Sequence, residues 1–212
     1  MIDQGFFAKH LLGKKELTQV EMDAAFSDAW SYVAARGGII DIPIDETLRN
    51  DSKEWAERVK EAKSLEDHHK KDGRSESKRW TTGDIVEKAV RIALGRPGLP
   101  EESRTVGESP EFVGHDLLDL GTEVETKGST WGLLPVVKKG EERAQIIGIL
   151  SEARDVVHVL GLALPCYLHT RSSRLLVKDQ EMYKSKGGFW GFEKLIPLPS
   201  LEELIRMFPV KQ

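Results

Sequence analysis

The sequence predicts an α/β protein with a central mixed β-sheet flanked by helices and with a helical N-terminal segment. Short apolar runs that suit strands alternate along the chain with segments whose apolar residues recur at helical spacing. Residues 156–168 form a long, nearly continuous apolar run, as expected of a strand that is buried on both faces. The chain has 212 residues, of which 39% are hydrophobic, so it can support one sizeable core with an appended segment.

The N-terminal segment, residues 1–65, is predicted to be helical and to pack on the core. Apolar residues recur at helical spacing over 18–35, and residues 51–63 form a second, more polar helix. Between them, residues 39–44 predict a short strand or extended stretch. The charged residues 66–79 contain little that could join a core and predict a linker or surface loop.

Residues 80–212 are predicted to form the core and a C-terminal extension. A helix over 81–95 is expected to be capped by Thr81 or Thr82 and to end at Gly95. Two short strands follow on either side of Leu120-Gly121. The remaining expectations are a strand at 133–137, an amphipathic helix at 139–154, the buried strand at 156–168, a strand at 175–177 and a final helix at 201–207.

Composition limits the environments in which the protein is expected to work. No apolar run reaches the roughly 18 residues of a membrane span, and the N-terminus lacks a signal-peptide pattern. Cys166 is the single cysteine, which excludes an internal disulfide and a cysteine-based zinc site. We therefore expect a cytoplasmic protein without a membrane partner. The net charge of −4 does not by itself indicate a nucleic-acid binder.

Residues 114–129 carry the strongest functional signal. Because strand side chains alternate between faces, Glu123, Glu125 and Lys127 are predicted to share one face. If Leu120-Gly121 is a two-residue hairpin loop, Asp116 lies opposite Glu125, with Cβ atoms about 4.5–5.5 Å apart. Two carboxylates then converge beside an ammonium group. A divalent cation would turn their repulsion into an all-oxygen site.

The alternative interpretation of this stretch is the solvated face of an antiparallel sheet, where alternating charges are common. Two features favour a functional site. The segment has few apolar residues to face a core, and glycines flank it at Gly114, Gly121 and Gly128, where backbone or ligand can approach closely.

The segment also resembles the PD-(D/E)XK nuclease motif, in which an Asp precedes a Glu-x-Lys on the next strand. Asp116, Glu125 and Lys127 match those positions, and residues 125–129 resemble the Glu-Val-Lys-Gly-Ser form of many members. The predicted order helix, strand, strand, strand, helix, strand over about residues 80–170 is similar to the core of this superfamily. The resemblance implies a restriction-endonuclease-like core.

A second register is possible. Residues 120–126 resemble the Leu-Gly-x-Glu-Leu-Lys-Thr stretch of mismatch-repair nicking enzymes of the MutH type, and Glu-x-Glu-Thr resembles BamHI-type restriction enzymes. In that register Asp116 and Glu123 bind the metal and Glu125 takes the place of the Lys. Glu87 resembles the helix glutamate that can join such a metal site, and its alternative role is an ordinary surface pair with Arg91.

The resemblance implies an Mg²⁺-dependent DNA endonuclease, with Mn²⁺ as a possible substitute, of the type II restriction class. Asp116 and Glu125 would bind the metal with help from Glu87 or Glu123, and Lys127 would act on the attacking water. The expected partners are double-stranded DNA and a second copy of the chain. A repair or junction-resolving nuclease, or a non-catalytic nucleic-acid-binding module of the same fold, are the alternatives.

Local basic groups are the expected DNA contacts. Lys184 and Lys186 precede a Gly- and aromatic-rich stretch at 187–192, and Arg171 with Arg174 follow the predicted buried strand. Lysine and arginine contacts to phosphates set the affinity for DNA without reading its sequence. We therefore predict that these four residues face the DNA backbone.

Overall fold

The computed structural model describes residues 19–63, 76–98, 116–133, 135–138, 143–164, 187–189, 192 and 195–210. Its centre is a four-stranded sheet in the order β1-β5-β4-β2. β2 runs parallel to β4, and the other neighbours are antiparallel. The sheet strands are β1 (Ile40–Pro43), β2 (Glu125–Thr130), β4 (Gln145–Ser151) and β5 (Val156–Ala163), while β3 (Val136–Lys138) and β6 (Gly187–Phe189) pair separately.

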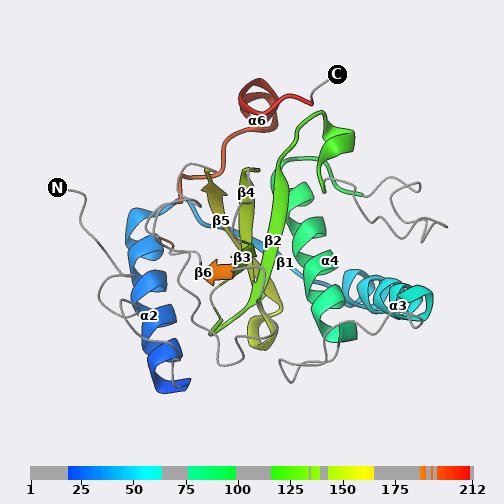
Figure 1. Ribbon diagram of the computed structural model, residues 1–212, viewed down its shortest axis with the longest axis horizontal. Helices are drawn as coiled ribbons and strands as arrows, with labels where there is room; N and C mark the ends of the chain where they lie inside the picture. The colour runs from blue at the N-terminus through cyan, green and yellow to red at the C-terminus, as the bar shows by residue number, and fades with distance from the viewer. Residues whose placement is uncertain are drawn as a thin grey trace.

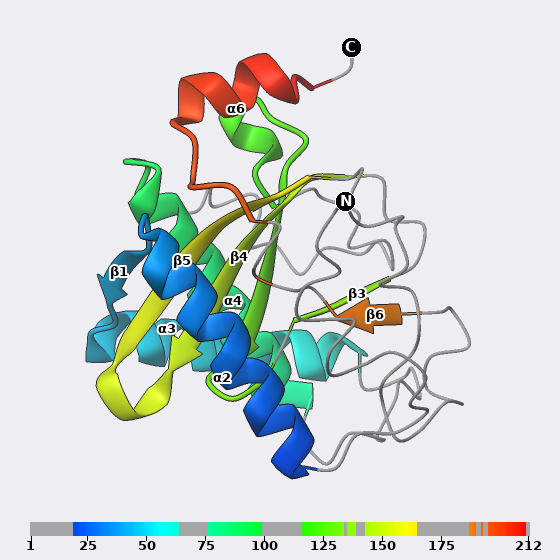
Figure 2. The same ribbon diagram turned by 90° about the vertical axis from the view of Figure 1, so that its left-hand side faces the viewer.

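Helices cover both faces of this sheet, which confirms the predicted α/β class. In Figures 1 and 2, α4 (Glu76–Ala93) lies against one face and α2 (Gln19–Arg36) lies on the opposite side. α3 (Glu46–Lys63) packs on the outside of α4. The short α6 (Leu201–Met207) lies at one end of the sheet, near the 3₁₀ turn η2 (Leu118–Leu120). In the described parts, no helix is long and apolar enough to cross a membrane.

The core lies between α4 and the sheet, and two glycines let the helix approach closely. Gly128 and Gly148 are direct neighbours across β2 and β4, and Val86 of α4 lies over both. The surrounding buried side chains are Ile85, Ala89 and Val90 of α4 with Ile146, Leu150, Val157, Val159 and Leu162 of the sheet. The face of β2 that carries Val124 and Gly128 therefore faces α4.

The opposite face is covered in part by aromatic side chains of α2. The Phe26 ring contacts Trp131 and Phe192, with centroids 5.2 and 5.9 Å apart. Trp30 lies 5.0 Å from the ring of His158 on β5. Aromatic side chains of α2 thus contact residues of the core, and β1, from the same chain segment, adds a strand to the sheet.

We expect Gly148→Ala to destabilise the fold by about 1–3 kcal/mol, the usual cost of overpacking a core. A Cβ atom at Gly148 would lie 2.6 Å from Val86 Cγ1, so the helix or the strand must shift. Gly83→Ala in α4 is the control, because its Cβ would meet nothing within 4 Å and alanine favours a helix interior. Urea unfolding of both variants measures the difference. Equal stability of the two would contradict the close packing.

The amphipathic helix predicted over 139–154 is wrong for its described part. Residues 145–151 form β4 and are all buried, and only 152–154 form a short 3₁₀ turn, η3. β4 is covered on both faces and has a neighbouring strand on each side. Such a strand gives a continuous apolar run, which also satisfies helical spacing.

The helix predicted over 81–95 begins earlier than expected. α4 starts at Glu76, so residues 76–79 of the predicted linker form its first turn. The Thr81 and Thr82 hydroxyls do not cap a helix; they donate to the carbonyls of Ser77 and Lys78 within it. The predicted end is confirmed near Gly95, which has a φ of 71°.

The hairpin predicted around Leu120-Gly121 does not form. Residues 118–120 are a 3₁₀ turn that ends at Gly121 with a φ of 86°. The next residues pair with the C-terminal segment: Thr122 forms a bridge with Pro209, and the Glu123 N–H donates to the Phe208 carbonyl. Asp116 therefore does not lie opposite Glu125 on a neighbouring strand.

The other predicted elements are confirmed or lie outside the described residues. The strands at 39–44, 133–137 and 156–168 correspond to β1, β3 and β5. The final helix at 201–207 begins at a capping box between Ser200 and Glu203. Cys166, the strand at 175–177, and the proposed DNA contacts Arg171, Arg174, Lys184 and Lys186 lie outside the described residues.

Candidate active site

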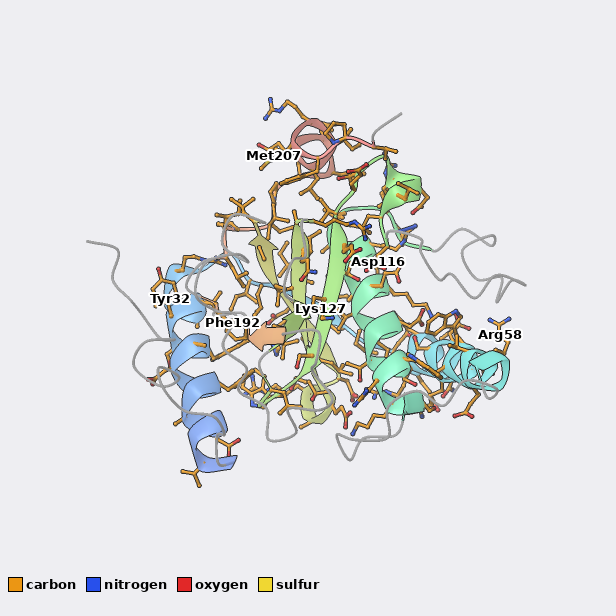
Figure 3. The ribbon with its side chains drawn as sticks, in the orientation of Figure 1. Tyr32, Arg58, Asp116, Lys127, Phe192 and Met207 are labelled. Atoms are coloured by element: carbon orange, nitrogen blue, oxygen red, sulfur yellow. The ribbon has the colours of Figure 1, made fainter. Side chains whose placement is uncertain are left out.

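Asp116 lies at the free edge of β2, on the side of α4 (Figure 3). Its Oδ2 atom accepts hydrogen bonds from the Thr126 backbone N–H at 2.7 Å and from the Thr126 hydroxyl at 2.6 Å. The Thr126 N–H points away from β4, because the neighbouring Glu125 N–H donates to Ala144 of the adjoining segment. Asp116 thus contacts β2 at the edge that faces away from β4, where no other strand of the described residues pairs.

Arg91 fixes the turn that carries Asp116. It is almost completely buried in α4, and it donates to the Asp116 carbonyl at 3.2 Å and to the Gly98 carbonyl at 2.9 Å. Both of its terminal nitrogens also bind the Asp119 carboxylate. A bidentate guanidinium holds its partner in a fixed orientation. Arg91 therefore serves Asp119 and the turn, and the surface pair between Glu87 and Arg91 does not form.

Glu87 lies on α4 one turn before Arg91 and close to Asp116. Its carboxylate makes no hydrogen bond or ion pair with any residue in the ranges that the structure describes. The pKa of Glu87 is raised to about 8, first by burial and then by the negative charges of Asp116 and Asp84, with Arg91 acting in the opposite direction. The carboxyl group is therefore mostly neutral at pH 7.

The pKa of Asp116 is also raised, and burial is again the largest cause. The two hydrogen bonds from Thr126 act in the opposite direction because they stabilise the charged form. Glu125 raises this pKa and Lys127 lowers it. The charges of Glu125 and Lys127 therefore act at Asp116, so four of the predicted residues belong to one electrostatic cluster.

Glu125 and Lys127 share the face of β2 that points away from α4. Val124 is fully buried in the core and Gly128 faces Val86, so the alternate residues must point the other way. The predicted alternation along this strand is confirmed. Glu125 forms an ion pair with Arg143, a residue just before β4. Asp116 and Glu87 thus lie on one side of the free edge of β2, and Glu125 and Lys127 on the other.

Glu123 precedes Glu125 by one pleat and lies on the same side of the chain as Glu125, opposite Val124. Its backbone belongs to the pairing with the C-terminal segment. The main causes of the pKa shift of Asp116 include Glu125 and Lys127. This arrangement favours the first register of the motif, in which Glu125 and Lys127 are the functional pair.

The carboxylate oxygens of Glu87, Asp116 and Glu125 are ligands of the kind that Mg²⁺ prefers, but the three groups do not lie together around one point. Among the described residues, no three His, Cys, Asp or Glu side chains lie close enough together to hold a metal ion. Mg²⁺ is usually held by only one or two carboxylates, with waters and substrate phosphates completing its octahedron. Asp116 and Glu87 would supply such a pair, and Glu125 would have to exchange Arg143 for the metal.

Three polar partners were not identified from the sequence as parts of this site. Thr126 holds Asp116, Arg143 holds Glu125, and Gln145 is the β4 neighbour of Glu125. Arg143 and Gln145 belong to the segment that was predicted as a helix over 139–154, and this prediction did not place them beside β2. Correct assignment of β4 would have indicated both.

No protein family, curated protein or solved structure was found to match this chain.

Proposed function

We propose that this protein is an Mg²⁺-dependent DNA endonuclease with a PD-(D/E)XK-type site and that it acts as a restriction enzyme on double-stranded DNA. One observation carries the proposal. The Glu87 and Asp116 carboxylates lie next to each other and are both half-buried, without an ion pair in the described part of the chain, beside a strand with the pattern Glu125-x-Lys127. Burying an acid without a partner is costly, and functional sites commonly hold such groups.

A bound divalent cation would neutralise the repulsion between the Glu87 and Asp116 carboxylates. Without it, a proton neutralises Glu87 at neutral pH. Metal ligands must be deprotonated, so binding would release that proton and make metal affinity depend on pH. Asp116 is already oriented by Thr126, which would fix one ligand oxygen before the metal arrives. Mn²⁺ has similar ligand preferences and would substitute.

The chemistry proposed is hydrolysis of a phosphodiester. The oxygen of a water bonds to phosphorus, the bond from phosphorus to the 3′ oxygen breaks, and the products are a 3′ hydroxyl and a 5′ phosphate. Bound Mg²⁺ would supply charge neutralisation and a more acidic water. Lys127 would orient the attacking water and stabilise the negative charge that develops on the phosphate. Two copies of the chain would place two such sites on the two strands.

A non-catalytic nucleic-acid-binding module is the second candidate, and the ion pair between Glu125 and Arg143 favours it. A glutamate that is neutralised by arginine has a structural role without any metal. The two candidates differ in whether Glu125 leaves Arg143 when Mg²⁺ and DNA are present.

Cleavage of supercoiled plasmid DNA in Mg²⁺, Mn²⁺, Ca²⁺ and chelator tests the proposal. We expect discrete bands in Mg²⁺ or Mn²⁺, none in chelator, and no product from Glu125→Ala, which should still bind DNA in Ca²⁺. Glu202→Ala, on the exposed face of α6, is the control and should cleave normally. Random nicking would indicate a repair enzyme. DNA binding without metal-dependent cleavage would support the non-catalytic module.

A further inference from the structure

Gln145 is the first residue of β4 and lies directly beside Glu125. The two residues are partners in the parallel register of β2 and β4, and Ala163 of β5 is the neighbour of Gln145 on its other side. Ile146 belongs to the core beneath α4, so the side chain of Gln145 points to the opposite face. That is the face on which Glu125 and Lys127 lie.

The side-chain amide of Gln145 is buried, and it has no hydrogen-bond partner among the described residues. The residue is 3% exposed, and its Oε1 atom is fully buried without a hydrogen bond. Neither amide atom makes a hydrogen bond with another residue in the part of the chain that the structure describes. Leaving such a group unsatisfied costs about 1–3 kcal/mol, and most buried polar atoms in native proteins avoid it. Packing alone does not explain a glutamine at this position.

We propose that Gln145 is a positioning residue of the nuclease site, where its amide oxygen accepts a hydrogen bond from the water that attacks the phosphodiester. This inference rests on the proposed function. An attacking water needs acceptors for its two protons while its lone pair points at phosphorus. Charged Lys127 can only donate. Gln145 Oε1 and Glu125, side by side across β2 and β4, would supply two acceptors on one face.

The neutral amide suits this place for an electrostatic reason. Glu87, Asp116 and Glu125 already bring three carboxyl groups to the site, and the charge of Glu125 acts on Asp116. A fourth carboxylate would add repulsion and raise further the cost of ionising the others. An amide gives an acceptor oxygen at every pH without adding charge.

The first test compares Gln145→Met with wild type. Methionine has a similar volume and no side-chain group that requires a hydrogen-bond partner, so the metal-free variant should be as stable as wild type or more stable. We expect kcat to fall by about 10- to 100-fold, a loss of the size seen when a hydrogen bond that orients a reacting group is removed. KM for DNA should stay near the wild-type value.

Ser151→Ala is the matched control, because Ser151 is a buried polar residue at the far end of the same strand. It should leave kcat unchanged. An unchanged kcat in Gln145→Met would overturn the inference while leaving the nuclease proposal intact. A loss of stability together with a rise in KM would also overturn it, since that pattern indicates a structural role.

A second readout does not depend on cleavage. The chain has five glutamines, so ¹⁵N-labelled glutamine gives a simple spectrum in which Gln145→Met assigns the Gln145 side-chain amide. Paramagnetic Mn²⁺ at the site should broaden this signal selectively. Mn²⁺ binding that leaves the signal sharp would place the amide away from the site and overturn the inference alone. Absence of both Mn²⁺ binding and cleavage in wild type would remove the proposed function and this inference together.

Discussion

Replacing Glu87 by glutamine is expected to stabilise the metal-free protein, and increasingly so as the pH rises. The pKa of Glu87 is about 8 in the folded protein, against an ordinary value of 4.5. Between these values the folded state keeps a proton that the unfolded state has lost, so the free energy of unfolding falls as the pH rises. Glutamine has no proton to lose and makes no such contribution.

The size of the effect follows from the shift. The difference between 4.5 and about 8 corresponds to a ceiling of about 5 kcal/mol, at about 1.4 kcal/mol per pH unit. Solvent at the partly exposed carboxyl reduces this, and we expect a gain of about 2–3 kcal/mol at pH 8.5. The gain should disappear at pH 4, below both pKa values. Glu87 has no hydrogen bond to lose in the described structure, so the substitution removes charge and little else.

Urea unfolding between pH 4 and pH 8.5 measures this. Glu202→Gln on α6 is the control, because its side chain is exposed to solvent and the substitution should have only a small effect on stability. If the free energies of unfolding of Glu87→Gln and wild type change in parallel with pH over this range, the Glu87 carboxyl is ionised normally. The argument from the Glu87 and Asp116 carboxyl pair then fails.

The same variant is informative about the metal. Mg²⁺ should raise the melting temperature of wild type by mass action, and more at pH 8.5 than at pH 6, because a proton no longer competes for Glu87. Glu87→Gln should lose most of this response. If millimolar Mg²⁺ leaves the melting temperature of wild type unchanged at both pH values, the result would count heavily against a metal site.

The arrangement of side chains on β2 was predictable because its signal is local. Alternation with period two places Glu125 and Lys127 on one face, and a single buried residue, Val124, is enough to fix which face. The hairpin before it was not predictable from turn residues. Gly121 does adopt a positive φ, but it ends a 3₁₀ turn, and the chain then pairs with Phe208 and Pro209, more than 80 residues away in sequence.

One physical cause explains both the incorrect helix prediction over 139–154 and the failure to identify Arg143 and Gln145 as neighbours of Glu125. β4 is buried on both faces, so its sequence shows no alternation, and burial decided its structure. The position of Asp116 likewise depends on Arg91 and Thr126, which come together because α4 packs closely on β2 and β4 at Gly128 and Gly148. Contacts of this kind follow from tertiary packing, and spacing along the chain does not indicate them.

Lys127→Ala is expected to lower the cleavage rate by roughly 10²- to 10⁴-fold, the range typical of a positioned group that acts on a transferring proton. Lys127 lies on the same face of β2 as Glu125, and its charge lowers the pKa of Asp116. Its removal therefore takes a cation from the attacking water and also makes Asp116 harder to ionise. Single-turnover cleavage at saturating protein separates this loss from weaker DNA binding.

Glu123→Ala distinguishes the two registers of the motif. Glu123 lies one pleat before Glu125 and its backbone N–H donates to the Phe208 carbonyl, whereas Lys127 is among the main causes of the Asp116 pKa shift. Loss of Glu123 should therefore cost much less than loss of Lys127. The reverse order would move the site to Asp116, Glu123 and Glu125.

The dependence of the cleavage rate on pH gives a further check on the role of Lys127. Because Lys127 lowers the pKa of Asp116, Lys127→Ala should shift the acidic limb of the rate profile toward higher pH. An unshifted limb would mean that Lys127 acts on the water and not on Asp116.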